Sequence, residues 1–579
     1  MARIKTTFAL AAAIALLGAF LMQGAAFIRA NSQTFDEAVH LAAGYSYLST
    51  GDFRLNAAHP PLSKQLAALP LYLFYRPKFK PDRELWKEAA EWKIGLDFLY
   101  HGADSHERVL TICRMPNLLL GAALIALVGW WSRRLWGTAS GLVAMAVAAF
   151  DPNLIAHSSL ITPDLAIGFF YFSTFYLCWE YAGSPSGWRL VAVGVSTGCA
   201  LASKHTALIL LLPLCLVFLL TDAAKLSDER DSWWSLRRLR RAAVPLGGVA
   251  IVALLLLSMV HLFFSVPTWI TGFIGHLRGP AVPVFFLGEI STEGWWLYFP
   301  LALVLKTPVG TLLMLLLSLL LWGTGKRLER RHLLFIALPI TVYFLAIVLA
   351  RVNVGVRYLL PIYPFLFLLC SRLATIRFSA PIPGLLARSV LIGLPIALSI
   401  SSSLGVAPHQ LAYFNSLAGG PAKGASYLGD SNLDWGQDLE NLRAFLEEEQ
   451  VPMVYLSYFG TAPPGSYGIR YQFLPGFPAP LEDPSRDLLP PHSSKELLAI
   501  SVNNLHGTYL PDKNLYGWLR AYSPMARIGY SIYVYDLTGD AAAHRQLARI
   551  YRRAGMERHA EAEERRAART RSSRFVPAP

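Results

Sequence analysis

The chain has 579 residues, a formal net charge of +14 and a composition that is 54% hydrophobic. Its mean hydropathy of +0.39 lies well above that of soluble proteins, and apolar runs of about 20 residues recur along it. These features exclude a soluble globular protein and indicate an α-helical polytopic membrane protein. The basic residues lie largely in short loops between apolar runs, which is typical of topology signals and lipid contacts rather than of nucleic-acid binding.

The first apolar run, from Phe8 to Phe27, is long enough to span a bilayer. The segment that follows, Thr34 to Lys64, reads TFDEAVHLAAGYSYLSTGDFRLNAAHPPLSK. Its adjacent carboxylates Asp36 and Glu37 are expected at the membrane surface, where the spacing predicts a short helix from Glu37. The proline pair after His59 predicts a rigid, extended turn. An acidic pair and a basic turn in one loop at the lipid boundary suit chemistry on a lipid head group.

Further apolar runs predict about eleven membrane-spanning helices in total. Several of these runs are shorter than an ideal span. The spans predicted after the first run are 110–131, 138–150, 164–182, 188–202, 205–221, 242–264, 296–322, 333–350, 357–371 and 385–404.

The distribution of arginine and lysine predicts the orientation of these spans. Alternate connections are basic, for example 230–241 and 326–331, so the positive-inside rule places them and the N-terminus in the cytoplasm. The segments then expected on the outer side are 29–109, 151–163, 265–295 and everything beyond residue 405.

Residues 405–540 have the composition of a small soluble domain outside the membrane. Short β-rich segments alternate there with helical ones, which predicts an α/β layer domain. A charged, alanine-rich tail over 541–579 predicts a solvated helix. The strands expected in the domain are Tyr427–Asp430, Val454–Phe459, Leu497–Val502 and Ile528–Leu537, and the expected helices are Trp435–Glu449, capped by Asp434, and Tyr516–Tyr522.

Ionisable residues at the predicted outer ends of spans are candidate functional groups, because charges inside a membrane are costly and usually have a role. Asp164 begins one span, and Lys204 interrupts apolar sequence at the end of another. Lys306 lies deep in its run, and Arg357 offers a planar guanidinium suited to phosphate. The alternatives are a helix N-terminal signal for Asp164 and snorkelling for Lys204 and Arg357.

The sequence resembles the protein O-mannosyltransferase-like group, glycosyltransferase family 39. The resemblance rests on DEAVH, YLSTGDF and HPPLSK in the first outer segment, and on GEISTEGWWLYFPLALVLKTP, NVGVRYLLPIYP, YFNSLAGG and LGDSNLDWGQDL further on. It implies a GT-C membrane domain over residues 1–404, with the outer loop 29–109 catalytic. It also implies transfer of a sugar from a polyprenyl-phosphate carrier, with inversion, on the extracytoplasmic side of a bacterial inner membrane.

The resemblance further implies roles for single residues. Asp36 would be the catalytic base with Glu37 supporting it, and Asp164 would match the second outer acidic residue of the family. His59 and Lys64 would lie near the donor phosphate. The candidates for binding the donor phosphate and lipid are therefore His59, Lys64, Lys204, Lys306 and Arg357.

The chain departs from relatives at two points. Ala57 and Ala58 stand where the related aminoarabinose transferases of lipid A carry a metal-binding carboxylate, so a divalent metal stays an open alternative with no ligand assigned. The β-trefoil domain of eukaryotic mannosyltransferases has no counterpart in the sequence, so the acceptor hydroxyl could belong to a protein, a lipid or a glycan. The expected partners are a polyprenyl-phosphate sugar donor, an unknown acceptor and membrane lipids, without nucleic acid.

A transporter or flippase for a lipid-linked sugar is the alternative function. Such a protein would place polar groups near mid-membrane in broken helices, often in two repeated halves. Here the candidate residues gather at the predicted outer ends of spans, and the sequence shows no repeat. The sequence therefore favours a glycosyltransferase.

Overall fold

The computed structural model describes residues 2–102, 105–225, 236–263, 266–279, 281–324, 329–350, 352–376, 386–387, 389–479, 488–489 and 495–569. The chain forms two compact units. The first comprises Met1–Ile28, Val39–Pro280 and Trp295–Gln410, and the second comprises Arg29–Ala38, Ala281–Gly294 and Leu411–Pro579. The second unit thus includes two short segments that precede its main part in the chain, one near the N-terminus and one near the middle. Much of the basic connections 230–241 and 326–331 lies outside the described residues.

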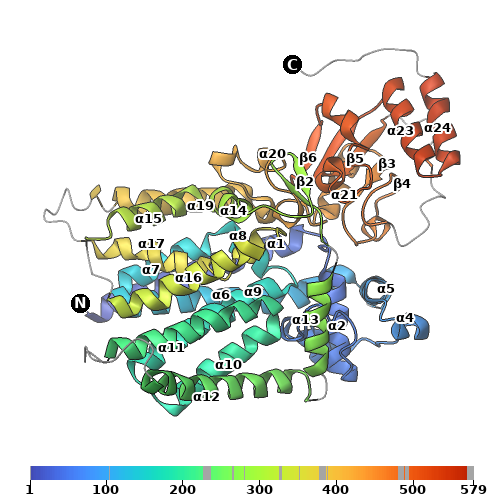
Figure 1. The fold of residues 1–579 in the computed structure, drawn as a ribbon. Helices are drawn as coiled ribbons and strands as arrows, with labels where there is room; N and C mark the ends of the chain where they lie inside the picture. The colour runs from blue at the N-terminus through green and yellow to red at the C-terminus, as the bar shows by residue number, and fades with distance from the viewer. Residues whose placement is uncertain are drawn as a thin grey trace. The chain divides into compact units, whose positions relative to one another are not determined.

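The first unit is a bundle of helices (Figure 1). Its helices carry apolar side chains over most of their surface, as expected where helices face lipid. Their bounds are α1 (Ala2–Ala30), α2 (Glu37–Thr50), α3 (Leu62–Pro70), α4 (Arg83–Lys87), α5 (Glu91–Leu96), α6 (His106–Trp136), α7 (Thr138–Ala149), α8 (Pro152–Ser158), α9 (Pro163–Gly183), α10 (Gly187–Ser203), α11 (Leu211–Lys225), α12 (Leu236–Val260), α13 (Val266–Arg278), α14 (Tyr298–Lys306), α15 (Val309–Leu320), α16 (Arg330–Ala350), α17 (Tyr363–Ser371) and α19 (Leu394–Val406).

Five helical segments in the described part of the chain are long and apolar enough to cross a membrane. Two bent pairs, α7 with α8 and α14 with α15, each pass the same test when they are taken together. These helices confirm the expected polytopic membrane protein, whereas the number of eleven spans stays a prediction. The five segments are Thr7–Ala30, His106–Trp136, Arg240–Val260, His332–Ala350 and Ser389–Val406.

The span predicted as continuous over 296–322 is instead sharply bent. Helix α14 ends at Lys306 and α15 begins at Val309, at an angle of 109°. Pro308 has no N–H to continue the helical hydrogen bonds, and it forces the preceding residue, Thr307, into an extended conformation. The break leaves Lys306 at a helix end rather than within a continuous span.

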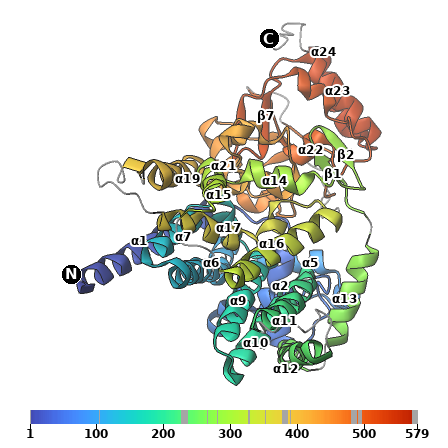
Figure 2. The same cartoon turned by 60° about the vertical axis from the view of Figure 1, so that its left-hand side comes forward.

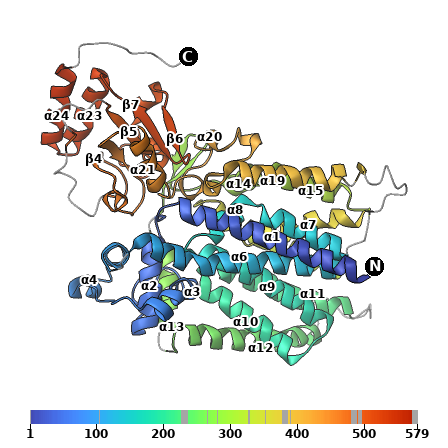
Figure 3. The ribbon, with the colours of Figure 1, turned by 180° about the vertical axis from the view of Figure 1, so that it is seen from behind.

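Close helix packing holds the first unit together. Helix α10 packs against α9 on one side and α12 on the other, and Figure 1 shows these helices running alongside each other. A Cβ on Gly194 or Gly198 would come within 2.5 Å of Val252 Cβ or 2.8 Å of the Ala253 carbonyl oxygen. This GxxxG spacing lets α10 and α12 approach closely, as is common between membrane helices. Figure 3 shows α1 lying along α6 on the other side of the bundle.

The second unit is built on a five-stranded mixed sheet with the strand order β4-β3-β5-β7-β6. Strand β3 pairs in parallel with β4 and β5, and β7 pairs antiparallel with β5 and β6. The expected α/β domain is thus confirmed as a fold. The strands are β1 (Val284–Phe286), β2 (Glu289–Ser291), β3 (Val454–Ser457), β4 (Tyr471–Phe473), β5 (Leu497–Ser501), β6 (Ala526–Ile528) and β7 (Ile532–Asp536), with helices α20 (Pro421–Gly424), α21 (Leu439–Glu448) and α22 (Val502–His506).

The segment Tyr427–Asp430, predicted as a strand, is not one. Only Leu428 makes a β-bridge, to Phe286. Asp430 adopts a left-handed backbone conformation with φ of +56°, which does not fit a strand.

The helix predicted over Trp435–Glu449 begins four residues late, at Leu439. Gly436 has φ of +83°, which is incompatible with an α-helix, and a Cβ there would lie 2.7 Å from the Tyr458 hydroxyl. Asp434 therefore does not cap the helix. Its carboxylate instead accepts a hydrogen bond of 3.0 Å from the backbone N–H of Asn503.

The charged tail is folded rather than a single solvated helix. It forms α23 (Ala541–Arg553) and α24 (Glu557–Arg569), which lie side by side (Figure 2), and apolar side chains of both join the core of the second unit. The buried His544 donates hydrogen bonds to the carboxylates of Glu563, at 2.7 Å, and Glu496, at 3.1 Å. The many charged residues of the tail predicted a solvated helix, but some of these charged side chains form pairs inside the fold.

Candidate active site

A buried carboxylate with two cations lies at the start of α9 in the first unit. The Lys204 ammonium is 2.5 Å from Asp164 Oδ1, and the Arg357 guanidinium is 3.8 Å from Asp164 Oδ2. The Asp164 side chain is fully buried, and the Lys204 side chain nearly so. Two cations therefore lie within ion-pair distance of one buried carboxylate.

Interruptions of the helices position both cations. Lys204 has an extended backbone between α10 and the 3-10 helix His205–Leu210. Arg357 lies in the 3-10 helix Val356–Leu359, which follows Gly355 with φ of +109°. The ring of Tyr358 adds a cation–π contact 3.9 Å from the Lys204 nitrogen. Non-helical backbone within a membrane bundle is tolerated where protein surrounds it or where it lines a cavity.

His59 belongs to the same electrostatic environment. Its ring lies edge-on to that of His40, with 5.3 Å between the centroids, and His40 Nδ1 is 2.9 Å from the Ile161 carbonyl oxygen. Burial, followed by the positive charges of His40 and of lysine and arginine side chains, holds the pKa of His59 well below its usual range. The cations that act on it are Lys64, Lys204 and Arg357. The first unit thus brings His59, Lys204 and Arg357 together, although they are far apart in sequence.

Lys64 makes contacts different from those expected of a phosphate ligand. Its ammonium donates hydrogen bonds to the carbonyl oxygens of Asn56, at 2.8 Å, and His59, at 2.7 Å. It lies 2.8 Å from the Tyr47 hydroxyl, and its side chain is almost wholly buried. Three protein oxygens therefore surround the three N–H donors of the ammonium. We infer that Lys64 holds the turn before the proline pair in place.

Lys306 is a second buried cation of the first unit, with a carboxylate in its surroundings. It ends α14 and is fully buried, and its ammonium interacts electrostatically with the Asp151 carboxylate. Asp151 also caps α8, because its Oδ1 accepts the Leu154 N–H at 2.9 Å. The Asn153 amide donates a hydrogen bond of 2.7 Å to the Lys306 carbonyl oxygen. These contacts fix the bend between α14 and α15.

Asp36 and Glu37 lie in the second unit, on the segment Arg29–Ala38. Glu37 is buried, and its Oε2 accepts the Thr34 N–H at 2.8 Å, as in a capping box at the start of α2. Asp36 is half-buried. Glu37 thus stabilises the turn that carries Asp36.

The motif LGDSNLDWGQDL holds the segment that carries Asp36. The N–H of Ser32 donates to the Gln437 carbonyl, and the N–H of Phe35 donates to the Trp435 carbonyl, both at 2.9 Å. Asn441 donates a further hydrogen bond of 3.1 Å to the Ala30 carbonyl. Sequence reasoning missed this role, because no local pattern indicates that residues 435–441 pair with residues 30–35. The resemblance of this motif to the family was the available signal.

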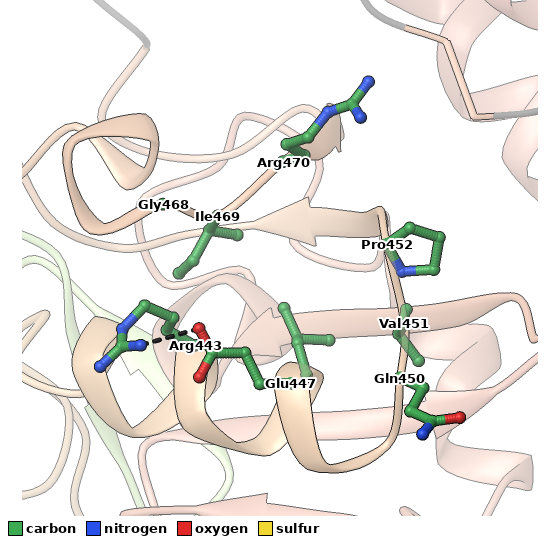
Figure 4. Close-up of a pocket in the computed structure, with 9 residues that line it drawn as sticks. Arg443, Glu447, Gln450, Val451, Pro452, Gly468, Ile469 and Arg470 are labelled. Carbon is green, nitrogen blue, oxygen red and sulfur yellow. Dashed lines mark hydrogen bonds and ion pairs between the residues drawn. The ribbon is translucent and has the colours of Figure 1, made fainter.

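In the part of the chain that the structure describes, no group of three or more histidine, cysteine, aspartate or glutamate side chains is arranged to hold a metal ion. Two cavities at the surface contain none of the predicted site residues. One, of about 550 Å³, is lined by residues that include Asp52, Arg54 and Lys87. The other, of about 310 Å³, lies in the second unit beside Arg443 and Glu447, which form an ion pair of 2.8 Å (Figure 4). The charged cluster around Asp164 is therefore the better candidate site.

Comparison with known proteins indicates the family that the chain resembles. Residues 13–273 match the family model described as dolichyl-phosphate-mannose-protein mannosyltransferase. The resemblance to glycosyltransferase family 39 is confirmed. The match covers less than half of the chain and supports a membrane glycosyltransferase. Together with the apolar helices of the first unit, it confirms the expected fold class. The matched range contains Asp36, Glu37, His59, Lys64, Asp164 and Lys204.

Several solved structures are similar to the chain at low identity. ArnT from Cupriavidus metallidurans bound to undecaprenyl phosphate has 13% identity and a TM-score of 0.48, with 93% of this chain and 98% of that chain covered. AglB from Archaeoglobus fulgidus, in complex with an inhibitory peptide and a dolichol-phosphate, has 11% identity, a TM-score of 0.40 and coverages of 76% and 58%. The Pmt1–Pmt2 complex of S. cerevisiae bound to the sugar donor has 17% identity, a TM-score of 0.32 and coverages of 44% and 34%.

All three TM-scores lie below 0.5. No curated protein matches the chain significantly in sequence.

The contacts of Lys64 predict a mainly structural effect of its removal. Lys64→Met would leave the buried carbonyl oxygens of Asn56 and His59 without their donor, at a cost of about 1–3 kcal/mol each. The melting temperature of the detergent-solubilised chain should therefore fall clearly. Lys93→Met, at an exposed position of α5, is the matched control and should melt like the wild type. Unchanged melting of Lys64→Met, combined with weaker binding of a lipid phosphate, would instead make Lys64 a phosphate ligand.

Proposed function

We propose that the protein transfers a sugar from a polyprenyl-phosphate carrier to an acceptor hydroxyl. The observation that carries this proposal is the buried cluster of Asp164, Lys204 and Arg357, in a chain that matches a family named for a lipid-phosphate sugar donor. A lysine and an arginine held next to each other at one buried position are suited to bind the oxygens of an anion. A phosphate monoester or diester is the anion that such a donor supplies.

The residues of the cluster have distinct roles in this proposal. Arg357 offers a planar fork of N–H donors to phosphate oxygens, and Lys204 offers a compact point charge. Asp164 accepts the Lys204 ammonium and so fixes where that charge lies. His59, whose pKa is lowered, is neutral at pH 7 and can donate a single hydrogen bond without adding charge. Lys306, whose ammonium interacts electrostatically with Asp151, is assigned a supporting role.

The reaction we propose is a direct displacement at the anomeric carbon. The acceptor oxygen forms a bond to this carbon on one face of the sugar while the bond to the phosphate oxygen breaks on the other, so the configuration inverts. The electron pair of the broken bond stays on the phosphate, whose growing charge Lys204 and Arg357 stabilise. The acceptor proton passes to the Asp36 carboxylate, the role that the family resemblance implies, and Glu37 keeps the Asp36 turn in place.

We further propose that this reaction takes place on the extracytoplasmic side of a bacterial inner membrane. The basic connections between the spans support this orientation, because they are expected to stay in the cytoplasm while the loop with Asp36 lies opposite. Sugars carried by a lipid are suited to that side, because the carrier anchors the donor where soluble nucleotide-sugars made in the cytoplasm do not reach.

Arg357→Gln should weaken donor binding, because it removes a charge-assisted contact worth about 1.5–3 kcal/mol, or on the order of 10- to 100-fold in affinity. The measurement is binding of a radiolabelled polyprenyl-phosphate sugar to the purified chain. Arg133→Gln, at an exposed arginine of α6, is the matched control and should bind the donor like the wild type. Equal donor affinity in Arg357→Gln and the wild type would remove Arg357 from the site.

Asp36→Asn should lower turnover by about two to four orders of magnitude, the usual contribution of a general base, with little change in donor affinity. Turnover is measured as polyprenyl phosphate released from the labelled donor, and folding is checked by the melting temperature. Near-normal turnover in this variant would contradict the assignment of Asp36 and move the role of base to Glu37 or Asp164.

A further inference from the structure

Four aromatic rings of the second unit gather next to the candidate base. Phe35 directly precedes Asp36, and its ring centroid is 5.2 Å from that of Phe459 and 6.3 Å from that of Phe477. The Tyr509 ring completes the group, 5.3 Å from Phe459 and 5.0 Å from Phe477. The planes of neighbouring rings differ by only 12–33°. We call these four residues the aromatic platform.

Hydrogen bonds fix the backbone of the platform. The Thr461 hydroxyl donates to the Phe35 carbonyl oxygen at 2.7 Å and accepts a bond of 2.8 Å from the Gln33 side chain. The side-chain oxygen of Asn504 accepts the N–H of Phe477 at 3.1 Å. The rings are therefore held in place before any ligand arrives, which reduces the entropy lost on binding.

The platform is only partly buried. Phe459 is 3% exposed and lies at its base, whereas the Phe477 side chain is 37% exposed. Phe35 and Tyr509 are half-buried. Core packing accounts for Phe459, but it does not account for three large rings held rigidly with part of their surface in solvent.

Carboxylates lie at the edge of the platform. Asp430 accepts a hydrogen bond from the Tyr509 hydroxyl, and its own backbone N–H donates to the Asn503 side chain at 2.8 Å. Asp36 follows Phe35 in the chain. Both carboxylates are half-buried. The platform thus combines aromatic surface with strong hydrogen-bond acceptors.

This combination matches the chemistry of a sugar ring. One face of a pyranose carries C–H groups with partial positive charge, which pack favourably on the electron-rich face of an aromatic ring. The hydroxyls at the rim of the sugar are donors, and ionised carboxylates are their strongest acceptors in proteins. A serine or threonine side chain in a peptide offers one hydroxyl and no such apolar face.

We propose that the aromatic platform binds a saccharide, and that the acceptor hydroxyl therefore belongs to a glycan, either free or attached to a lipid. The assignment of this saccharide as acceptor rests on the proposed glycosyltransferase function and on Asp36 as its base. The binding of a saccharide to the platform does not depend on that function and is measured separately.

The test uses the full-length, fluorescently labelled chain in detergent on an array of defined oligosaccharides, glycolipids with the same sugars, and serine- and threonine-containing peptides. We expect binding to saccharides, with Phe477→Ala lowering the affinity at least 10-fold and Tyr509→Phe lowering it less. Leu417→Ala removes an exposed apolar side chain elsewhere in the second unit and is the matched control, which should bind like the wild type. Melting temperatures confirm that each variant is folded.

The outcomes distinguish a free glycan from a glycolipid, and they test the saccharide site separately from the proposed glycosyltransferase function. Binding to free oligosaccharides or to glycolipids supports the proposal if Phe477→Ala weakens that binding. Binding to glycolipids alone would mean that a lipid must present the sugar, whereas binding to free oligosaccharides would mean that no lipid is needed. Binding to peptides alone, no saccharide binding, or saccharide binding equal in Phe477→Ala and the wild type would overturn the proposal. Donor cleavage by the wild type with water as acceptor is measured without any saccharide. Its failure would overturn the proposed function and leave the saccharide site standing.

Discussion

The buried ion pair between Asp164 and Lys204 is the interaction on which the candidate site depends. It joins the first turn of α9 to the break after α10, and Arg357 adds a third charge from another 3-10 segment. Breaking such a buried pair by removing one partner typically costs about 3–5 kcal/mol, because the remaining charge is left uncompensated. Well-packed apolar residues would be at least as stable, so stability alone does not explain the pair. We infer that the pair serves to hold its cation in place for an anionic ligand.

The contrast between Lys204 and Lys64 shows how similar residues serve different purposes. Both are buried lysines in the part of the chain that matches the family. Lys204 faces a carboxylate with Arg357 close by, so its environment is one of charge. Lys64 is surrounded by neutral oxygens of its own turn, so it fixes the position of His59 rather than attracting a phosphate. Burial, followed by the positive charges around it, lowers the pKa of His59.

The sequence predicted those parts of the protein that local patterns determine. Apolar runs located the helices of the first unit, and β-rich segments located β3, β5 and β7. The DEAVH and HPPLSK motifs, together with the ionisable residues at predicted helix ends, identified residues that the structure brings together at His59, Lys204 and Arg357.

What sequence reasoning missed depends on contacts between distant segments. The helix predicted from Trp435 begins only at Leu439, because the carbonyls of Trp435 and Gln437 accept hydrogen bonds from the segment before α2. The charged tail folds because His544 and Glu563 pair with each other inside the second unit. The aromatic platform is assembled from four separate stretches, and no single stretch indicates it. Such partners are invisible to composition and periodicity.

The most direct test of the central claim is the position of the lipid phosphate in an experimental structure of the complex. The purified chain, reconstituted with polyprenyl phosphate, would be imaged by electron cryo-microscopy. The account predicts the phosphate oxygens at about 3 Å from the guanidinium of Arg357, the length of a charge-assisted hydrogen bond, with Lys204 still paired to Asp164. A phosphate bound elsewhere, with no contact to Arg357 or Lys204, would contradict it.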